Sequence, residues 1–254
     1  MATELAEKLY QRFTLESRLY QLGLQLQELE EEIPRRKYRV RLAGVALTEY
    51  EGMGLRSFLD KLSGKFGEKQ ENLQRALRSA QAELEAGTVE QNRLKQQQAG
   101  LLQQLEPLRE LGDVLSCAAS LPEAEKTQVL QLEARLCTQR LAHALEETYK
   151  ALEIAQEWVR PNNRVDTAPG HTKGILMSAA DRWARDCMEE MSRIAQCGIL
   201  LDIHPYFTNP TGYISGVTQF NQLDRLNRAL SAVSQAQGQA QELLLQLPQW
   251  EEWE

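Results

Sequence analysis

The sequence has few of the residues from which compact enzymes build reactive sites. Aromatic residues make up 6% of the 254 residues, and the chain has three histidines. It contains no C-x-x-C pair, no H-E-x-x-H segment and no G-x-S-x-G segment, which are patterns typical of metal sites and nucleophilic serines. We therefore expect no enzyme activity, no metal site and no cofactor.

A phosphate-binding loop is also missing from the glycine-rich stretch GMGLRSFLDKLSGKFG at residues 52–67. A Walker A loop needs a glycine five residues before the glycine of its Gly-Lys pair, and a serine or threonine directly after the lysine. With Gly64 and Lys65 as that pair, Leu59 and Phe66 occupy the two required places. Both requirements fail, so the glycines indicate a change of chain direction instead.

Long apolar runs are absent as well. No stretch approaches the roughly 18 consecutive apolar residues that a membrane-spanning helix needs, and the N-terminus MATELAEKLYQRF has no apolar leader core. The four cysteines lie 20, 50 and 10 residues apart, which favours reduced thiols over a disulfide framework. We therefore expect a cytoplasmic protein. The net charge of -7 disfavours nucleic acid and anionic membranes as partners of the whole chain.

Leucine spacing is the strongest signal that is present. In two long segments, residues on one helix face recur at alternating steps of four and three, the a and d pattern of a coiled coil. In the first segment these positions hold Leu15, Leu19, Leu22, Leu26, Leu29 and Ile33. In the second segment they hold Leu73, Leu77, Ala80, Leu84, Gly87, Gln91, Leu94, Gln98, Leu101, Leu105 and Leu108. The glycine and the two glutamines predict the loosest packing.

Two such stripes joined by an interrupted segment predict an antiparallel helical hairpin over residues 1–112. The first helix is expected to run from about residue 2 to 33, because a proline at position 34 disfavours helical conformation in the residue before it. An irregular tip is then expected at about residues 34–67, where the glycines relieve the steric cost of non-helical backbone.

Residues 113–254 predict a helical bundle of three long helices. Two segments rich in proline, asparagine and glycine, residues 160–174 and 204–216, separate these helices. The expected core positions are Leu130, Ala134, Cys137, Leu141, Leu145, Thr148, Leu152, Ala155 and Val159, then Met177, Ala180, Ala184, Cys187, Met191, Ile194 and Leu201, then Phe220, Leu223, Leu230, Val233 and Leu244. The predicted fold is therefore all-α, an elongated antiparallel coiled-coil hairpin plus a helical bundle.

Two segments resemble a group of uncharacterised bacterial coiled-coil proteins of unknown function. The first is RSFLDKLSGKFGEKQENLQRALRSAQAELE, in which a Gly-Lys pair precedes a lysine- and glutamate-rich helix. The second is EWVRPNNRVDTAPGHTKGILMSAADRW, where Trp158, Asp166, Gly170, Lys173 and Ala179 stand at the positions of that group's late Trp/Asp/Gly-rich loop. The resemblance covers about two thirds of the chain. It implies a helical hairpin with a Gly-Lys tip and implies no chemistry.

A candidate docking face lies at the hairpin tip. Its residues are Phe58, Leu59, Leu62 and Phe66. The first three fall at i, i+1 and i+4, on one face of a short helix with little core beneath it. This face either folds down on the tip's own apolar residues or stays partly exposed as a docking surface. The sequence leaves both alternatives open.

A candidate basic patch follows a run of glutamates. It consists of Arg35, Arg36, Lys37, Arg39 and Arg41 around Tyr38. Cations near a stacking aromatic are typical of nucleic-acid binding. Cations placed just past a helix C-terminus also suit the helix dipole, and glutamates lie directly before them, so charge compensation is the favoured interpretation.

These observations together favour a non-enzymatic coiled-coil scaffold or adaptor that mediates protein-protein interaction. The partners would be other proteins. The apolar stripes exceed what the chain needs to cover its own helices, which suggests a homo-oligomer. Two alternatives from other classes remain open. One is nucleic-acid binding through residues 35–41, and the other is a membrane-associated remodelling hairpin.

Overall fold

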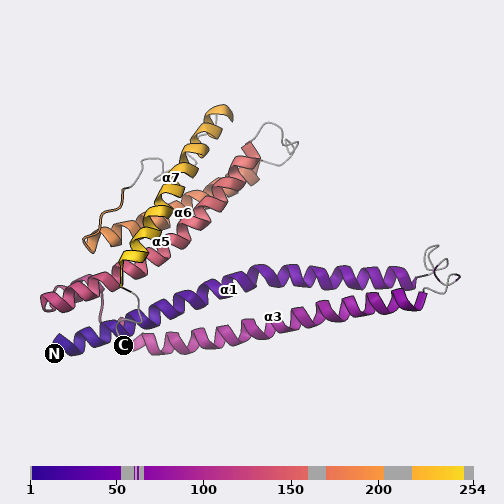
Figure 1. Cartoon of the computed structure of the whole chain (residues 1–254), viewed down its shortest axis with the longest axis horizontal. Coiled ribbons are helices and arrows are strands. Elements are labelled where there is room, and N and C mark those ends of the chain that lie inside the picture. The colour runs from indigo at the N-terminus through magenta and orange to yellow at the C-terminus, as the bar shows by residue number, and fades with distance from the viewer. Residues whose placement is uncertain are drawn as a thin grey trace. The chain divides into compact units, whose positions relative to one another are not determined.

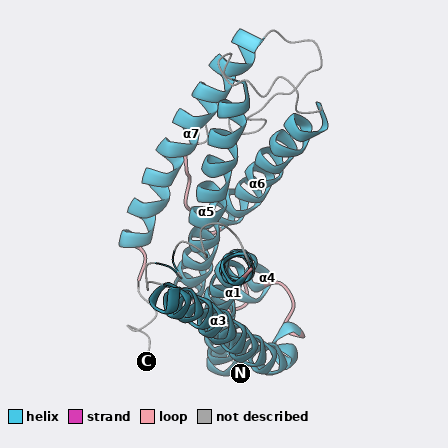
Figure 2. Ribbon diagram, turned by 90° about the vertical axis from the view of Figure 1, so that its right-hand side faces the viewer, coloured by secondary structure: helices cyan, strands magenta, loops and turns pink. Residues whose placement is uncertain are grey.

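The computed structural model describes residues 2–52, 60, 62, 66–159, 170–202 and 219–248. Across these ranges the chain forms six helices and no strand (Figures 1 and 2), which confirms the all-α prediction. The chain divides into two compact units, one of residues 14–110 and the other of residues 1–13 with 111–254. The prediction placed residues 1–13 with the hairpin, and the structure instead places them with the bundle.

The first unit is an antiparallel hairpin formed by α3 (Phe66–Arg109) and by α1 (Ala2–Glu51) from residue 14 onward, and the two helices run side by side in Figure 1. Polar contacts fix the direction, because rising residue numbers on α1 meet falling numbers on α3. Nζ of Lys95 lies 3.6 Å from a carboxylate oxygen of Glu30, and Nη1 of Arg39 lies 3.1 Å from one of Glu83.

The hairpin interface is formed by the predicted a and d positions. On α3, all eleven predicted positions are buried or half-buried, and nearly all the other positions between residues 71 and 109 are exposed. On α1, Leu15, Leu26 and Ile33 are buried, and the other three predicted positions are half-buried. The apolar period therefore identifies both faces correctly.

The predicted end of the first helix at Pro34 is wrong, because α1 continues without interruption to Glu51. A proline in a helix interior removes one hydrogen bond and costs about 3 kcal/mol. The apolar register continues beyond it through Val40, Ala43 and Leu47, all half-buried at further steps of three and four. Packing along this additional stretch offsets the cost of the proline. The hairpin tip consequently begins after residue 51 rather than at residue 34.

At Gly87, one of the positions predicted to pack loosely, a side chain of the opposite helix fills the space. Gly87 is buried, and a Cβ atom placed on it would lie 2.7 Å from Nη1 of Arg36. The same nitrogen donates a 3.0 Å hydrogen bond to the backbone carbonyl of Glu83. The absence of a side chain at Gly87 thus lets the Arg36 guanidinium cross the interface where a leucine would otherwise be expected.

The second unit contains three long helices, α5 (Glu123–Val159), α6 (Gly170–Gln196) and α7 (Gln219–Gln246). α5 packs against both of the others (Figure 2). Of the nine core positions predicted on α5, eight are buried and Leu130 is half-buried. α6 ends before the predicted Leu201, because the backbone turns at Gly198, which has a positive φ of 88°.

The core stripe predicted for α7 is displaced, although the predicted Val233 is buried. Leu223, Leu230 and Leu244 are half-buried at its edge. Ala232 is buried, and seven further buried positions recur at steps of three and four: Leu226, Ala229, Val233, Ala236, Ala240, Leu243 and Leu247. Three of these seven are alanines, whose small side chains give a weaker sequence signal than leucine but allow close packing against α5.

A separate small core holds the start of α1 to the bundle unit. Ala6, Leu9 and Phe13 pack against residues of α4 (Val114–Ala118) and against the first turns of α5. Two hydrogen bonds accompany this packing: Tyr10 Oη donates to Gln128 over 2.7 Å, and Arg12 Nη1 donates to the Gly112 carbonyl over 2.7 Å. This packing explains why residues 1–13 belong to the bundle unit.

Candidate interaction surfaces

The hairpin tip is joined to both helix ends by aromatic and ionic contacts. The rings of Tyr50 on α1 and Phe66 on α3 stack with centroids 5.2 Å apart. Asp60 is buried, and its carboxylate accepts hydrogen bonds from Lys69 Nζ at 2.8 Å and from Tyr50 Oη at 3.0 Å. These contacts anchor residue 60 to the last turn of α1 and the first turn of α3.

The candidate docking face at the tip is only partly within the described residues. Phe58 and Leu59 lie outside them. Leu62 is 71% exposed, whereas Phe66 is half-buried in its stack on Tyr50. The two residues of the face that the structure describes therefore differ in exposure, and the four-residue docking face stays a prediction.

The candidate basic patch lies on a helix rather than beyond a helix end, because α1 continues through it. Arg36 is paired with Glu32, and this hydrogen bond lowers the pKa of the Glu32 carboxyl. Arg39 is paired with Glu83 across the hairpin. Charge compensation thus accounts for two of the five cations.

The other three cations of the patch form no ion pair with any described residue. They are Arg35, Lys37 and Arg41. All three are exposed on α1. Cationic side chains on the hairpin thus remain available to an external partner.

An exposed apolar stripe accompanies these cations on α1. It consists of Tyr38, Leu42 and Val45, which are 59%, 50% and 45% exposed and fall at i, i+4 and i+7. At about 100° per residue, the stripe points roughly 165° away from the α1 residues of the hairpin interface. It therefore lies on the side of α1 opposite to α3. The sequence did not predict this stripe, because the first helix was expected to end before Pro34 and residues 38–45 were expected to belong to the irregular tip.

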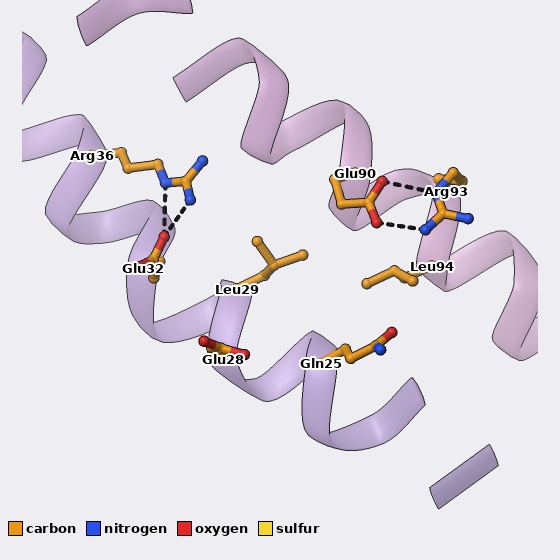
Figure 3. A pocket seen from close by; sticks show the side chains of 8 residues that line it. All are labelled: Gln25, Glu28, Leu29, Glu32, Arg36, Glu90, Arg93 and Leu94. Carbon is orange, nitrogen blue, oxygen red and sulfur yellow. Dashed lines mark hydrogen bonds and ion pairs between the residues drawn. The ribbon is translucent and has the colours of Figure 1, made fainter. Parts of the chain in front are cut away.

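A pocket of about 410 Å³ opens between α1 and α3 (Figure 3). Its polar walls contain two ion pairs, each formed within one helix: Arg36 with Glu32, and Arg93 with Glu90, where Nε donates over 2.8 Å. Leu29 lies between the two pairs in Figure 3, and Leu94 beside Arg93 is buried. Four of its five charged lining residues belong to these pairs and only Glu28 lies outside them, so the pocket is better explained as a gap between paired side chains.

The bundle contains a buried ion pair that the sequence did not reveal. Glu133 is 2% exposed and accepts a 3.1 Å hydrogen bond from Nε of Arg193, joining α5 to α6. The neighbouring Glu190 is desolvated, and this burial raises the pKa of its carboxyl. Among the described residues, no group of three or more His, Cys, Asp or Glu side chains is arranged to hold a metal ion.

The cysteines are free thiols. Burial raises the pKa of Cys187 and of Cys197 to about 12 each, and it raises the pKa of Cys137 as well. Since the thiolate is the nucleophile, these three groups are poorly suited to covalent chemistry.

Comparison of the chain with protein-family models, with curated proteins and with solved structures finds no match. The resemblance to bacterial coiled-coil proteins therefore stays a prediction. No helix within the described ranges qualifies by length and hydropathy as a membrane span. The surface with the clearest binding chemistry is the exposed stripe and the cations beside it.

Proposed function

We propose that the chain is a non-enzymatic coiled-coil scaffold or adaptor of the cytoplasm, which binds other proteins through the exposed stripe on α1. The stripe supports this proposal because three large apolar side chains lie together on the side of the helix that the hairpin does not use. Apolar residues at i, i+4 and i+7 are the pattern by which one helix packs against another.

The surroundings of the stripe add specificity. Arg35 and Arg41 lie on either side of it in the helical projection, and both are exposed. An apolar centre with charged flanks is typical of helix pairing, in which charges at the edges select the partner and its direction. A partner helix with apolar and acidic residues fits this surface.

The test compares affinity capture by the full chain with capture by a stripe variant, Leu42→Glu with Val45→Glu. Its control is Val89→Glu, which adds a charge at a 62% exposed valine of α3. Partners lost by the stripe variant and retained by the control would support the proposal. Identical capture by all three proteins would overturn it.

Nucleic-acid binding through residues 35–41 remains the alternative, because three of the five cations form no ion pair with described residues. Binding to a labelled duplex over a salt series tests it, since each phosphate contact adds about 0.9 to the slope of log affinity against log salt. Flotation with anionic vesicles tests the membrane-remodelling alternative.

A further inference from the structure

On the outer side of α1, residues of complementary chemistry lie at equal distances before and after Ile33. Glu31 and Arg35 lie two residues before and after it, and Leu24 and Leu42 lie nine residues before and after it. Glu28 and Tyr38 lie five residues on either side. At about 100° per residue, the six residues of these three pairs fall within an arc of about 80°. We call these six residues the outer face.

Residues of the outer face are accessible within their own unit. Glu28, Glu31, Arg35, Tyr38 and Leu42 are exposed, and Leu24 is half-buried. The outer face points away from α3, because the interface with α3 is formed by Ile33 and the other buried and half-buried a and d positions of α1. The charged members of the face can therefore pair with another molecule without disrupting the hairpin.

An antiparallel contact between two copies of α1 would bring these symmetric positions together. If a two-fold axis crosses α1 at the level of Ile33, Arg35 meets the partner's Glu31, and Glu31 meets the partner's Arg35. Leu42 meets the partner's Leu24, and the Tyr38 hydroxyl can donate to the partner's Glu28. Two-fold symmetry produces every one of these contacts twice.

We propose that the chain forms a homodimer in which the outer faces of two α1 helices pack antiparallel about this axis. The proposal deepens the proposed function, on which it rests, by naming a second copy as the occupant of the stripe region. From Leu24 to Leu42 the contact is about 27 Å long at 1.5 Å per residue. That length corresponds to roughly two and a half heptads of a coiled coil.

The order of charges selects this partner over a nucleic acid or an anionic membrane. The N-terminal half of the outer face is acidic, through Glu28 and Glu31, and the cation Arg35 lies in the other half. A uniformly anionic surface would be repelled by the acidic half. A helix with the reversed order of charges complements both halves, and a second α1 in antiparallel orientation has that order.

The test is sedimentation velocity on the full chain over a concentration series at low and high salt. The wild type should show a monomer-dimer equilibrium that weakens with salt. Arg35→Glu and Glu31→Arg, each alone, should raise the dimer dissociation constant about tenfold or more, because two attractive pairs become repulsive. Arg78→Glu makes the same charge change at an exposed position of α3 and should leave the constant unchanged.

Mixing the two single variants separates this contact from effects within one helix. In the mixed dimer, the glutamate at 35 meets the partner's arginine at 31, and Glu31 meets the partner's Arg35, so every pair is again attractive. Dimerisation should return to within about threefold of the wild type. Repulsion within each helix is unaffected by mixing, so such rescue can arise only between chains.

A wild type that stays monomeric throughout the concentration series overturns the homodimer, as does mixing without rescue. Binding of the monomer to anionic vesicles that is lost in Arg35→Glu would overturn it in favour of a membrane partner. The proposed function fails separately, if the Leu42→Glu and Val45→Glu variant still captures every protein that the wild type captures.

Discussion

Substitution of Gly87 by alanine tests whether the Arg36 side chain really crosses the hairpin interface. A glycine in a helix interior costs about 1 kcal/mol relative to alanine, so the substitution would ordinarily raise the free energy of unfolding by that amount. In this hairpin the new Cβ would lie 2.7 Å from Nη1 of Arg36. The guanidinium must move, and its hydrogen bond to the Glu83 carbonyl is lost.

The two effects nearly cancel. The donor of this hydrogen bond is charged but the bond is exposed to solvent, so it contributes at the lower end of the range for charged donors, about 1.5 kcal/mol, and its loss offsets the gain in helix propensity. We therefore expect Gly87→Ala to change the free energy of unfolding of the hairpin by close to zero. Gly100→Ala is the matched control, because Gly100 lies in the same helix and a Cβ there meets nothing within 4 Å. The control should stabilise the hairpin by about 1 kcal/mol.

Urea unfolding followed by far-UV circular dichroism measures the difference. A second comparison is made in the Arg36→Ala background, where Gly87→Ala should recover its gain of about 1 kcal/mol because no guanidinium occupies the space. Equal stabilisation by Gly87→Ala and Gly100→Ala in the wild-type background would refute the reasoning, since the guanidinium would then not depend on the glycine.

Three further measurements address other parts of the structure. Pro34→Ala should raise the melting temperature, because it restores a backbone donor inside α1 and removes a cost of up to about 3 kcal/mol; an unchanged or lower value would contradict the continuous helix. Thiol reagents should modify Cys137 and Cys187 slowly in the native protein and quickly in denaturant, because the pKa of Cys187 is raised to about 12 and that of Cys137 is raised further; rapid native labelling at neutral pH would show that the α5 and α6 core assignment is wrong. Arg193→Ala should destabilise the bundle by about 3 kcal/mol or more, since it leaves the Glu133 carboxylate buried without its cation, whereas Glu133→Gln should cost less, because the Arg193 side chain is 42% exposed and can turn to solvent. Equal losses for the two variants in urea unfolding would contradict this asymmetry.

The sequence predicts the hairpin well because its signal comes from leucines. Leu73, Leu94 and Leu105 mark an apolar period, and a period of 3.5 residues admits one packing face. The same reasoning fails on α7, where Ala236 and Ala240 are buried. Alanine is common on exposed helix surfaces as well as in cores, so its spacing carries less information than that of leucine.

Two features of the structure depend on contacts between residues far apart in the sequence: the continuation of α1 past Pro34 and the buried ion pair of the bundle. Pro34 has a strong local preference against helix, and only the packing of later residues such as Val40 and Leu47 on α3 outweighs it. The buried pair of Glu133 and Arg193 joins residues 60 positions apart, and neither residue differs in the sequence from its exposed neighbours. Local propensity and periodicity cannot identify such a pair.

The packing of Phe13 against residues of α4 and α5 also bears on the order in which the chain folds during synthesis. The first residues leave the ribosome long before α5, whose Val129, Leu132 and Leu136 complete their core. A hairpin formed in the meantime brings residues 13 and 111 close together, so the loop that the small core must close becomes short and its entropic cost falls. We therefore expect the hairpin to form first and the N-terminal turns to remain uncovered until α5 has emerged.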